Sequence, residues 1–191
     1  MCSMTERITL LAQEVLNLYA ELEKCQSNLF SCPQGCRICC NTPAYNIEVT
    51  ILEFLPLAIH LIDSNQSDWI ERIERSVDDE PCVLFQPDMS LKPEGGCLFH
   101  QFRPLVCRLF GASFTVRKDQ KQVLACRLLR QKVQQSIHLL PSAQDYNTRL
   151  ISIDFFLAKD TYGINTALRK AVEYAGLYYT PLYPARQIKS A

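Results

Sequence analysis

The chain has 191 residues, of which 48% are hydrophobic and 21% are charged, and its 20 basic residues balance 20 acidic ones. This length fits one domain that buries a core without disulfide bonds. The zero net charge argues against a protein held to nucleic acid by phosphate contacts. No apolar stretch is long enough to span a bilayer, so we expect neither a nucleic-acid partner nor a membrane partner.

The N-terminus and the cysteine content indicate the compartment. The segment from Met1 to Arg7 has no basic region followed by a long apolar run, so no signal peptide is expected. The chain has 10 cysteines, and in a reducing compartment such richness is typical of metal ligation or redox work rather than of disulfide bonds. We therefore expect a cytoplasmic protein.

Capping signals define helices in the first part of the chain. Ser3 and Glu6 have the spacing of a capping box, and Thr50 with Glu53 repeats that spacing. Ser67 is a further candidate N-cap. Apolar residues recur at helical intervals after each of these signals. The expected helices cover residues 5–27, residues from about 50 onward, and residues 68–77.

The second part of the chain predicts a hairpin followed by helices. Residues 113–116 and 122–125 are expected to form two short strands around a polar turn. Ser142 with Asp145 is a cap signal, and Gly176 is a candidate helix end. The expected helices cover residues 126–139, residues from about 143 to 159, and residues 165–175.

These elements predict a mainly α fold with a small β element. We expect a helical domain around a loop-rich cysteine cluster, with one short β-hairpin. Three segments are expected to pack as one globular unit: an N-terminal helix at 1–29, a cysteine-cluster metal-binding domain at 30–127, and C-terminal helices with a tail at 128–191.

Eight of the cysteines are candidate metal ligands. Four of them form the pattern C-x3-C-x2-C-C in residues 32–40, and crowded thiolates repel one another, so a cation is their natural partner. Inert packing explains a single buried cysteine but not this group. Cys2 and Cys25 lie at the terminus and near the end of the first helix, so we expect them to be unliganded. The candidate ligands are Cys32, Cys36, Cys39, Cys40, Cys82, Cys97, Cys107 and Cys126.

The spacing leaves the metal and the number of sites open. Zinc sites usually combine two paired knuckles of C-x2–4-C, and the second half of the chain has no such pair. Zinc, iron and an iron–sulfur cluster therefore all remain candidates. The eight cysteines suit two four-ligand sites, or one such site beside a more open one. Cys39 and Cys40 would point apart in an extended backbone and could serve different sites.

Two motifs carry a resemblance to a known family. The first, from Cys32 to Cys40, reads CPQGCRICC, and the second, from Gly96 to Arg108, reads GCLFHQFRPLVCR. Together they resemble the CxxCxxCC cysteine-cluster family, also called the YkgJ-type zinc- or iron-chelating domain.

The resemblance covers roughly residues 30–127 and implies a shared metal centre built from the eight cysteines. Residues 81–85 resemble the family's intervening cysteine segment, and Cys126 resembles its last cysteine. The family's domain also occurs in larger proteins, including flagellin lysine methylases. Because this chain has no glycine-rich nucleotide fingerprint, methylation is not carried over to it.

Charged neighbours of the cysteines allow two interpretations. Arg37, Arg103 and Arg108 either offset thiolate charge or bind an anionic partner, or they satisfy loop carbonyls. His100, shortly after Cys97, either replaces a thiolate as a ligand or donates a hydrogen bond to one.

Three functions remain open. The first is a cysteine-cluster metal-binding protein, for zinc or iron or a four-iron, four-sulfur cluster, with protein partners and an undefined cellular role. The second is an iron–sulfur-dependent redox or protein-modifying enzyme. Its C-x3-C-x2-C spacing matches radical-SAM enzymes, but the alternating strands and helices of their β/α barrel are missing. The third is a zinc-stabilised protein-interaction module. No catalytic residue can be named.

Overall fold

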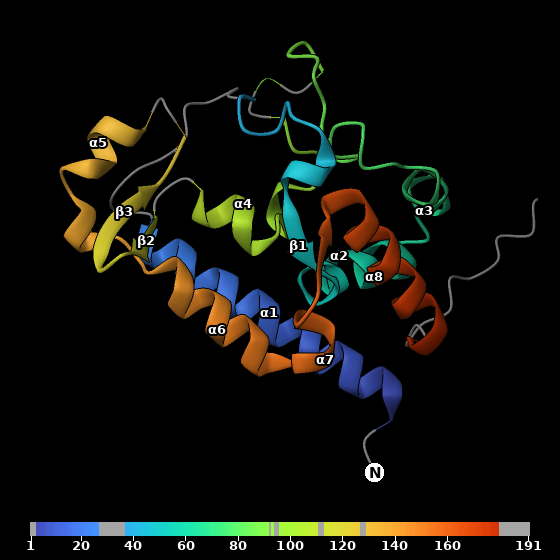
Figure 1. Ribbon diagram of the computed structural model, residues 1–191. Coiled ribbons are helices and arrows are strands. Elements are labelled where there is room, and N and C mark those ends of the chain that lie inside the picture. The colour runs from blue at the N-terminus through green and yellow to red at the C-terminus, as the bar shows by residue number, and fades with distance from the viewer. Residues whose placement is uncertain are drawn as a thin grey trace, which may run out of the picture.

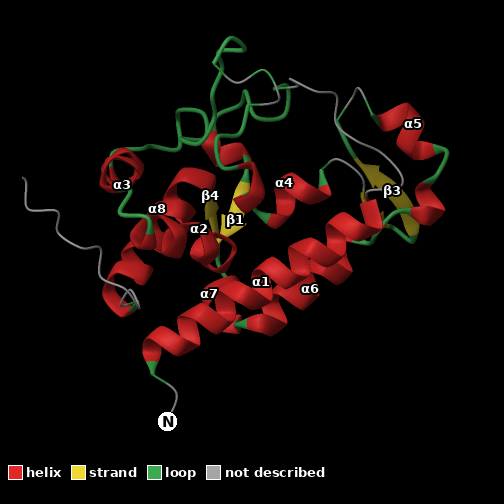
Figure 2. Cartoon of the chain, turned by 180° about the vertical axis from the view of Figure 1, so that it is seen from behind, coloured by secondary structure: helices red, strands yellow, loops and turns green. Residues whose placement is uncertain are grey.

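The computed structural model describes residues 3–26, 37–91, 93, 96–110, 113–126 and 129–179. Over these ranges the fold is mainly α-helical with two small antiparallel sheets, which confirms the predicted fold class. The long helix α1 (Met4–Gln26) runs beside α6 (Ala143–Ile153), and α2 (Ile51–Asp63) packs on α8 (Ile164–Tyr178) (Figure 1). Loops gather on one side of this helical body, at the top of Figure 1 and in green in Figure 2.

Local hydrogen bonds start the helices where the sequence predicts them. The Ser3 hydroxyl accepts from the Glu6 backbone N–H at 3.2 Å, and the Glu6 carboxylate accepts from the Ser3 N–H at 2.7 Å. A second capping box starts α2, as expected. The predicted short helix is α3 (Ser67–Glu74), in which Ser67 is the first helical residue rather than the N-cap.

Apolar side chains of the described residues pack in three clusters. In the first, α2 faces α8, and in the second, α1 covers the other side of α2 together with α4 (Leu105–Leu109), α6 and α7 (Phe155–Ala158). The third joins the β-hairpin to α5 (Arg130–Gln134). Helix α2 is apolar on most sides, including Pro56, because it lies between two helical layers. No helix in the described ranges has both the length and the apolar character needed to cross a membrane.

A short sheet that the sequence did not predict aligns the two central helices. Strand β1 (Glu48–Thr50) pairs antiparallel with β4 (Thr161–Gly163), so that Glu48 lies opposite Gly163. Strand β1 leads directly into α2, and β4 leads directly into α8. The pairing therefore sets the first turns of α2 and α8 side by side.

The predicted hairpin is confirmed. Strand β2 (Ser113–Arg117) pairs with β3 (Gln120–Leu124) around a two-residue turn. Both turn residues are left-handed, with φ of 47° at Lys118 and 60° at Asp119. Such turns match the right-handed twist of the flanking strands, which explains why the loop is shorter than expected.

Three predicted helix limits are wrong. The helix expected over 126–139 is reduced to α5 and a 3-10 turn, Ile137–Leu139. The helix expected to reach residue 159 breaks at Asp154, whose carboxylate caps α7 by accepting from the Leu157 N–H at 3.0 Å. Helix α8 runs through Gly176, where a Cβ would meet nothing within 4 Å.

Candidate metal centre

Five of the predicted ligands line one cavity of about 490 Å³. They come from three segments of the chain, residues 39–40, residue 82 and residues 97–107, and the fold brings them to one cavity wall. The five thiols belong to Cys39, Cys40, Cys82, Cys97 and Cys107.

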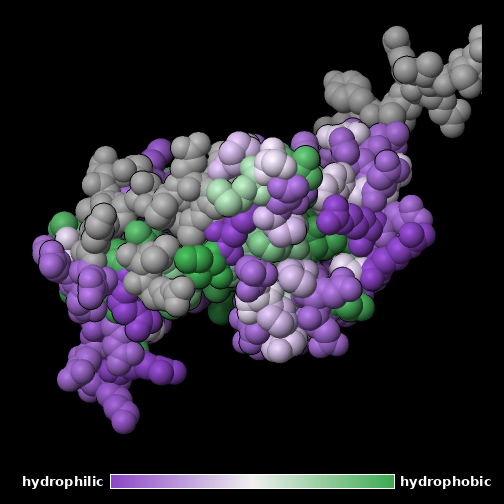
Figure 3. Space-filling model, turned by 90° about the horizontal axis from the view of Figure 1, so that it is seen from above, coloured by the Kyte–Doolittle hydropathy of each residue, from purple (hydrophilic) through white to green (hydrophobic). Residues whose placement is uncertain are grey.

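The rest of the cavity wall is mainly apolar. Side chains such as Ile47, Phe85 and Val106 form it, and among the described residues that line the cavity Arg103 is the only charged one. No carboxylate or imidazole belongs to this described lining. Seen from above in Figure 3, the loop side of the molecule exposes hydrophobic residues between polar ones. Thiols are thus the ligand groups that the described wall can offer to a metal as anions.

A turn that begins at Cys82 is paired with the backbone at Cys97. The Phe85 N–H donates to the Cys82 carbonyl at 2.8 Å, and Phe85 forms an isolated β-bridge with Cys97. A Cβ on Gly96 would lie 2.8 Å from the Phe85 ring, so a larger residue there would displace the ring. The Cys82 segment also borders a second, more polar cavity of about 800 Å³, whose wall includes Arg72.

A buried carboxylate positions the helix that carries Cys107. Glu53 is 4% exposed, and beyond its capping box it accepts from the Leu105 N–H at 2.8 Å, at the start of α4. Burial raises the pKa of Glu53, and the hydrogen bonds from Thr50 and Leu105 oppose that rise. One side chain therefore fixes the first turns of α2 and α4 together. The capping box was visible in the sequence, but this second bond was not.

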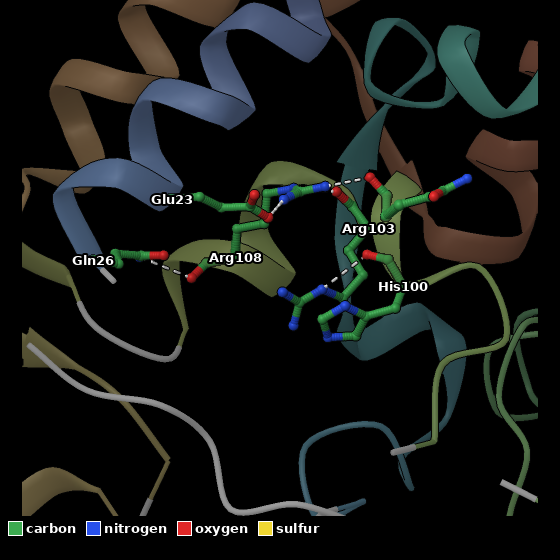
Figure 4. Close-up of polar contacts among 6 residues, drawn as sticks. Glu23, Gln26, His100, Arg103 and Arg108 are labelled. Carbon is green, nitrogen blue, oxygen red and sulfur yellow. Dashed lines mark hydrogen bonds and ion pairs between the residues drawn. The ribbon is translucent and has the colours of Figure 1, made fainter. Parts of the chain in front are cut away.

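Arg108 locks the same segment onto α1. Its guanidinium donates to the backbone carbonyls of Arg103 at 2.7 Å and Gln101 at 2.6 Å, and it pairs with Glu23 (Figure 4). It also lies 4.3 Å from the centroid of the Tyr19 ring. Of the two interpretations given for this arginine, the structure supports the satisfaction of loop carbonyls.

The other two arginines have different environments. Arg37 donates to the Gln86 carbonyl at 3.0 Å, so it too binds a loop. Arg103 donates its Nε to the His100 carbonyl at 3.2 Å, and its guanidinium lies apart from that of Arg108 (Figure 4). Its positive charge acts on the thiols of Cys39 and Cys107. Arg103 thus satisfies a loop carbonyl and also lines the thiol cavity, where its charge favours the thiolate form.

Cys39 and Cys40 lie in a turn and not in the extended backbone that would point them apart. Their Sγ atoms are 3.9 Å apart, and both line the same cavity. The hydrogen bond between Cys39 and Cys40, with help from Arg103, lowers the pKa of Cys39 to about 6. The same bond, together with burial, raises the pKa of Cys40.

The deeper thiols are held in their neutral form. Burial raises the pKa of Cys82 to about 12, with the neighbouring Cys97 adding to the effect. Burial, together with the nearby thiols of Cys82 and Cys97, raises the pKa of Cys107, and the charge of Arg103 opposes that rise. A dry group of thiols disfavours several negative charges without a cation, and a bound metal would reverse that preference.

The remaining candidates lie elsewhere or outside the description. Cys126 is buried beside Phe114 and Val133 in the third apolar cluster and does not line the cavity. Cys32 and Cys36 lie outside the described residues. Among described residues alone, no three His, Cys, Asp or Glu side chains are grouped closely enough to hold a metal.

Cys25 and His100 do not belong to the described cavity lining. Cys25 is exposed near the end of α1, where its Sγ lies 3.7 Å from the Tyr146 hydroxyl. Cys2 lies outside the described residues. His100 is not among the residues that line the cavity.

The sequence comparison supports the same part of the chain. Residues 31–138, more than half of the chain, match a family described as "Putative zinc- or iron-chelating domain". The chain belongs to the CxxCxxCC family. No curated protein and no solved structure shows a significant match to the chain. Family membership supports metal binding in general and agrees with a cavity walled by thiols.

Proposed function

We propose that this CxxCxxCC protein binds zinc or iron through cysteine thiolates at the thiol cavity. The observation that carries the proposal is that five thiols line one cavity whose described wall contains no carboxylate and no imidazole. Soft thiolate ligands favour zinc and iron–sulfur centres over magnesium or calcium. The family description supports the same class of metal.

The eight candidate ligands fall into three groups according to where they lie. Cys39, Cys40, Cys82, Cys97 and Cys107 form the core of the proposed centre. Cys32 and Cys36 join the set through the family motif alone. In this proposal Cys126 is a core residue of the third apolar cluster and not a ligand.

The surrounding residues prepare this cavity for a cation. Neutral thiols lose their protons when a metal binds, and the metal then compensates the resulting thiolates. Arg103 supplies one further positive charge, which limits the negative charge left on a centre with four thiolates. The bound metal would hold distant loops together, and in such sites metal binding and folding are coupled.

A second candidate is an iron–sulfur cluster. The cavity thiols of Cys82, Cys97 and Cys107 are single cysteines spaced along the chain, whereas zinc sites usually combine two paired knuckles of C-x2–4-C. A cluster would be held by the same thiolates and would supply one-electron chemistry when bound.

The test is the metal and acid-labile sulfide content per chain, measured on protein purified without oxygen and without a metal-binding tag. Zinc without sulfide supports a zinc centre, and iron with equal sulfide supports a cluster. A protein that carries neither metal, and takes up neither when supplied, contradicts the proposal.

Two variants show whether the cavity is the site. Cys107→Ser should lose metal, because its thiol is in the cavity wall. Cys25→Ser is the matched control, because this exposed thiol lies outside the cavity lining. Equal metal loss in both variants would show that the metal is bound elsewhere.

A further inference from the structure

A buried asparagine outside the cysteine motifs holds the Cys82 segment. Asn165 is the second residue of α8 and is 1% exposed. Its side-chain N–H groups donate to the carbonyls of Val77 at 2.8 Å and Pro81 at 3.2 Å. Its side-chain oxygen accepts from the Val83 N–H at 2.8 Å. All three bonds reach the segment from Val77 to Val83, which contains Cys82, and none serves its own helix.

Other contacts fix the same segment to the start of α8. Asp78 Oδ1 accepts from the backbone N–H groups of Asn165 and Thr166, each at 3.1 Å. Arg169 donates to the Ser76 carbonyl at 3.1 Å. The segment from residue 76 to residue 83 is therefore tied along its length to the first turns of one helix.

The opposite side of this segment is tied to the loop that follows Cys40. The Ala44 N–H donates to the Glu80 carbonyl at 2.8 Å, and the Tyr45 N–H donates to the Asp78 carbonyl at 3.1 Å. Pro43 and Pro81 form an isolated β-bridge between the two stretches. Helix α8 thus holds the Cys82 segment directly. Through that segment it also supports the loop that follows Cys40.

The chemistry of asparagine explains why this residue stands there. A buried amide of this kind has two N–H donors and a carbonyl acceptor, and here each side of the group is used. Asparagine is a poor residue within a helix, and burying it is unfavourable unless it is hydrogen-bonded. Its position therefore serves the segment around Cys82 and not the stability of α8 by itself.

We propose that Asn165 is a positioning residue of the metal centre, which places the Cys82 thiol for metal binding from α8. The inference rests on the proposed function. It extends the proposed metal centre to α8, a helix that lies beyond the family match at residues 31–138. Groups that orient metal ligands through hydrogen bonds typically change metal affinity by about 10–100-fold when they are removed.

The test compares full-length variants in two assays. Asn165→Leu keeps the number and branching of the side-chain heavy atoms and removes all three bonds. Leu168→Ala is the matched control, because it opens the core on the same helix, where Leu168 is 0% exposed. The first assay titrates metal-free protein with Zn²⁺ against a chelating indicator. The second measures the alkylation rate of Cys82 by iodoacetamide in metal-free protein, with peptide mass spectrometry as the readout.

We expect Asn165→Leu to weaken zinc binding by about 10–100-fold and to speed the alkylation of Cys82, while Leu168→Ala changes neither. Equal effects in the two variants, or no effect of Asn165→Leu, would overturn the inference and leave the proposed function intact. A wild-type protein that binds neither zinc nor iron would overturn both.

If Asn165→Leu does not fold by circular dichroism, Arg169→Gln carries the test. Arg169 is half-buried, and its bond to Ser76 lies at the far end of the same segment. A smaller loss of zinc affinity with faster Cys82 alkylation is expected, and wild-type values in both assays would overturn the inference.

Discussion

Replacing Arg108 by methionine should destabilise the fold by about 3.5 kcal/mol, which is the sum of the midpoints of the terms that follow. The Arg108 side chain is 3% exposed, donates to two backbone carbonyls and lies over the Tyr19 ring. Two hydrogen bonds from a charged donor contribute about 1.5–3 kcal/mol each. The ring contact adds about 0.5–2 kcal/mol. Burial of the methionine side chain returns about 1.5–3 kcal/mol.

The ion pair with Glu23 should contribute much less. Glu23 is 55% exposed, and pairs with an exposed partner are typically worth about 0–1 kcal/mol. We therefore expect Glu23→Gln to lower the free energy of unfolding by less than about 1 kcal/mol. The two variants separate the carbonyl bonds of Arg108 from its ion pair.

Urea unfolding of the metal-free protein, followed by circular dichroism, measures both effects. The slope of the free energy against urea should stay unchanged, so that the midpoint reports stability alone. Equal losses in the two variants would refute the reasoning, because the ion pair would then dominate. A loss below about 1 kcal/mol in Arg108→Met would refute it as well.

Three further predictions concern Glu53, Cys82 and Cys126. Burial raises the pKa of Glu53 above its unfolded value, so its contribution to stability is complete below about pH 4.3 and declines as the pH rises through the folded pKa. Glu53→Gln should therefore cost less stability at pH 7 than at pH 4 in urea unfolding of the metal-free protein, and a greater cost at pH 7 would contradict this account. Zinc binding at pH 7 should release protons and tighten as the pH rises, because Cys82 has a pKa of about 12 and must ionise to bind. Calorimetry in buffers of different ionisation enthalpy counts these protons, and a count of zero would disprove thiol ligation. Cys126→Ala should keep the wild-type metal content measured by elemental analysis, whereas metal loss would return Cys126 to the ligand set.

Local hydrogen bonding was the part of the fold that could be predicted from the sequence. Both capping boxes join residues three positions apart, so their spacing is visible in the chain. The hairpin follows from alternation around a polar turn. The break at Asp154 was not visible, because that residue also pairs with Arg7, 147 positions away.

The sequence predicted that thiols would form the site, but it did not predict which cysteines line the cavity. The motif spacing indicated a thiol cluster, and five of the eight candidates line the cavity. Spacing does not give orientation, so it could not show that Cys126 faces an apolar cluster. The supporting role of Glu53 depends on a contact with Leu105, 52 positions away, and no pattern in the sequence marks it.

The position of Asn165 sets a limit on how the molecule can be shortened. A protein cut at residue 138, where the family match ends, would lack α6, α7 and α8. The buried Val83 N–H would lose its acceptor, and the carbonyls of Val77 and Pro81 would lose their donor. A search for the smallest autonomous metal-binding unit in this chain should therefore keep α8.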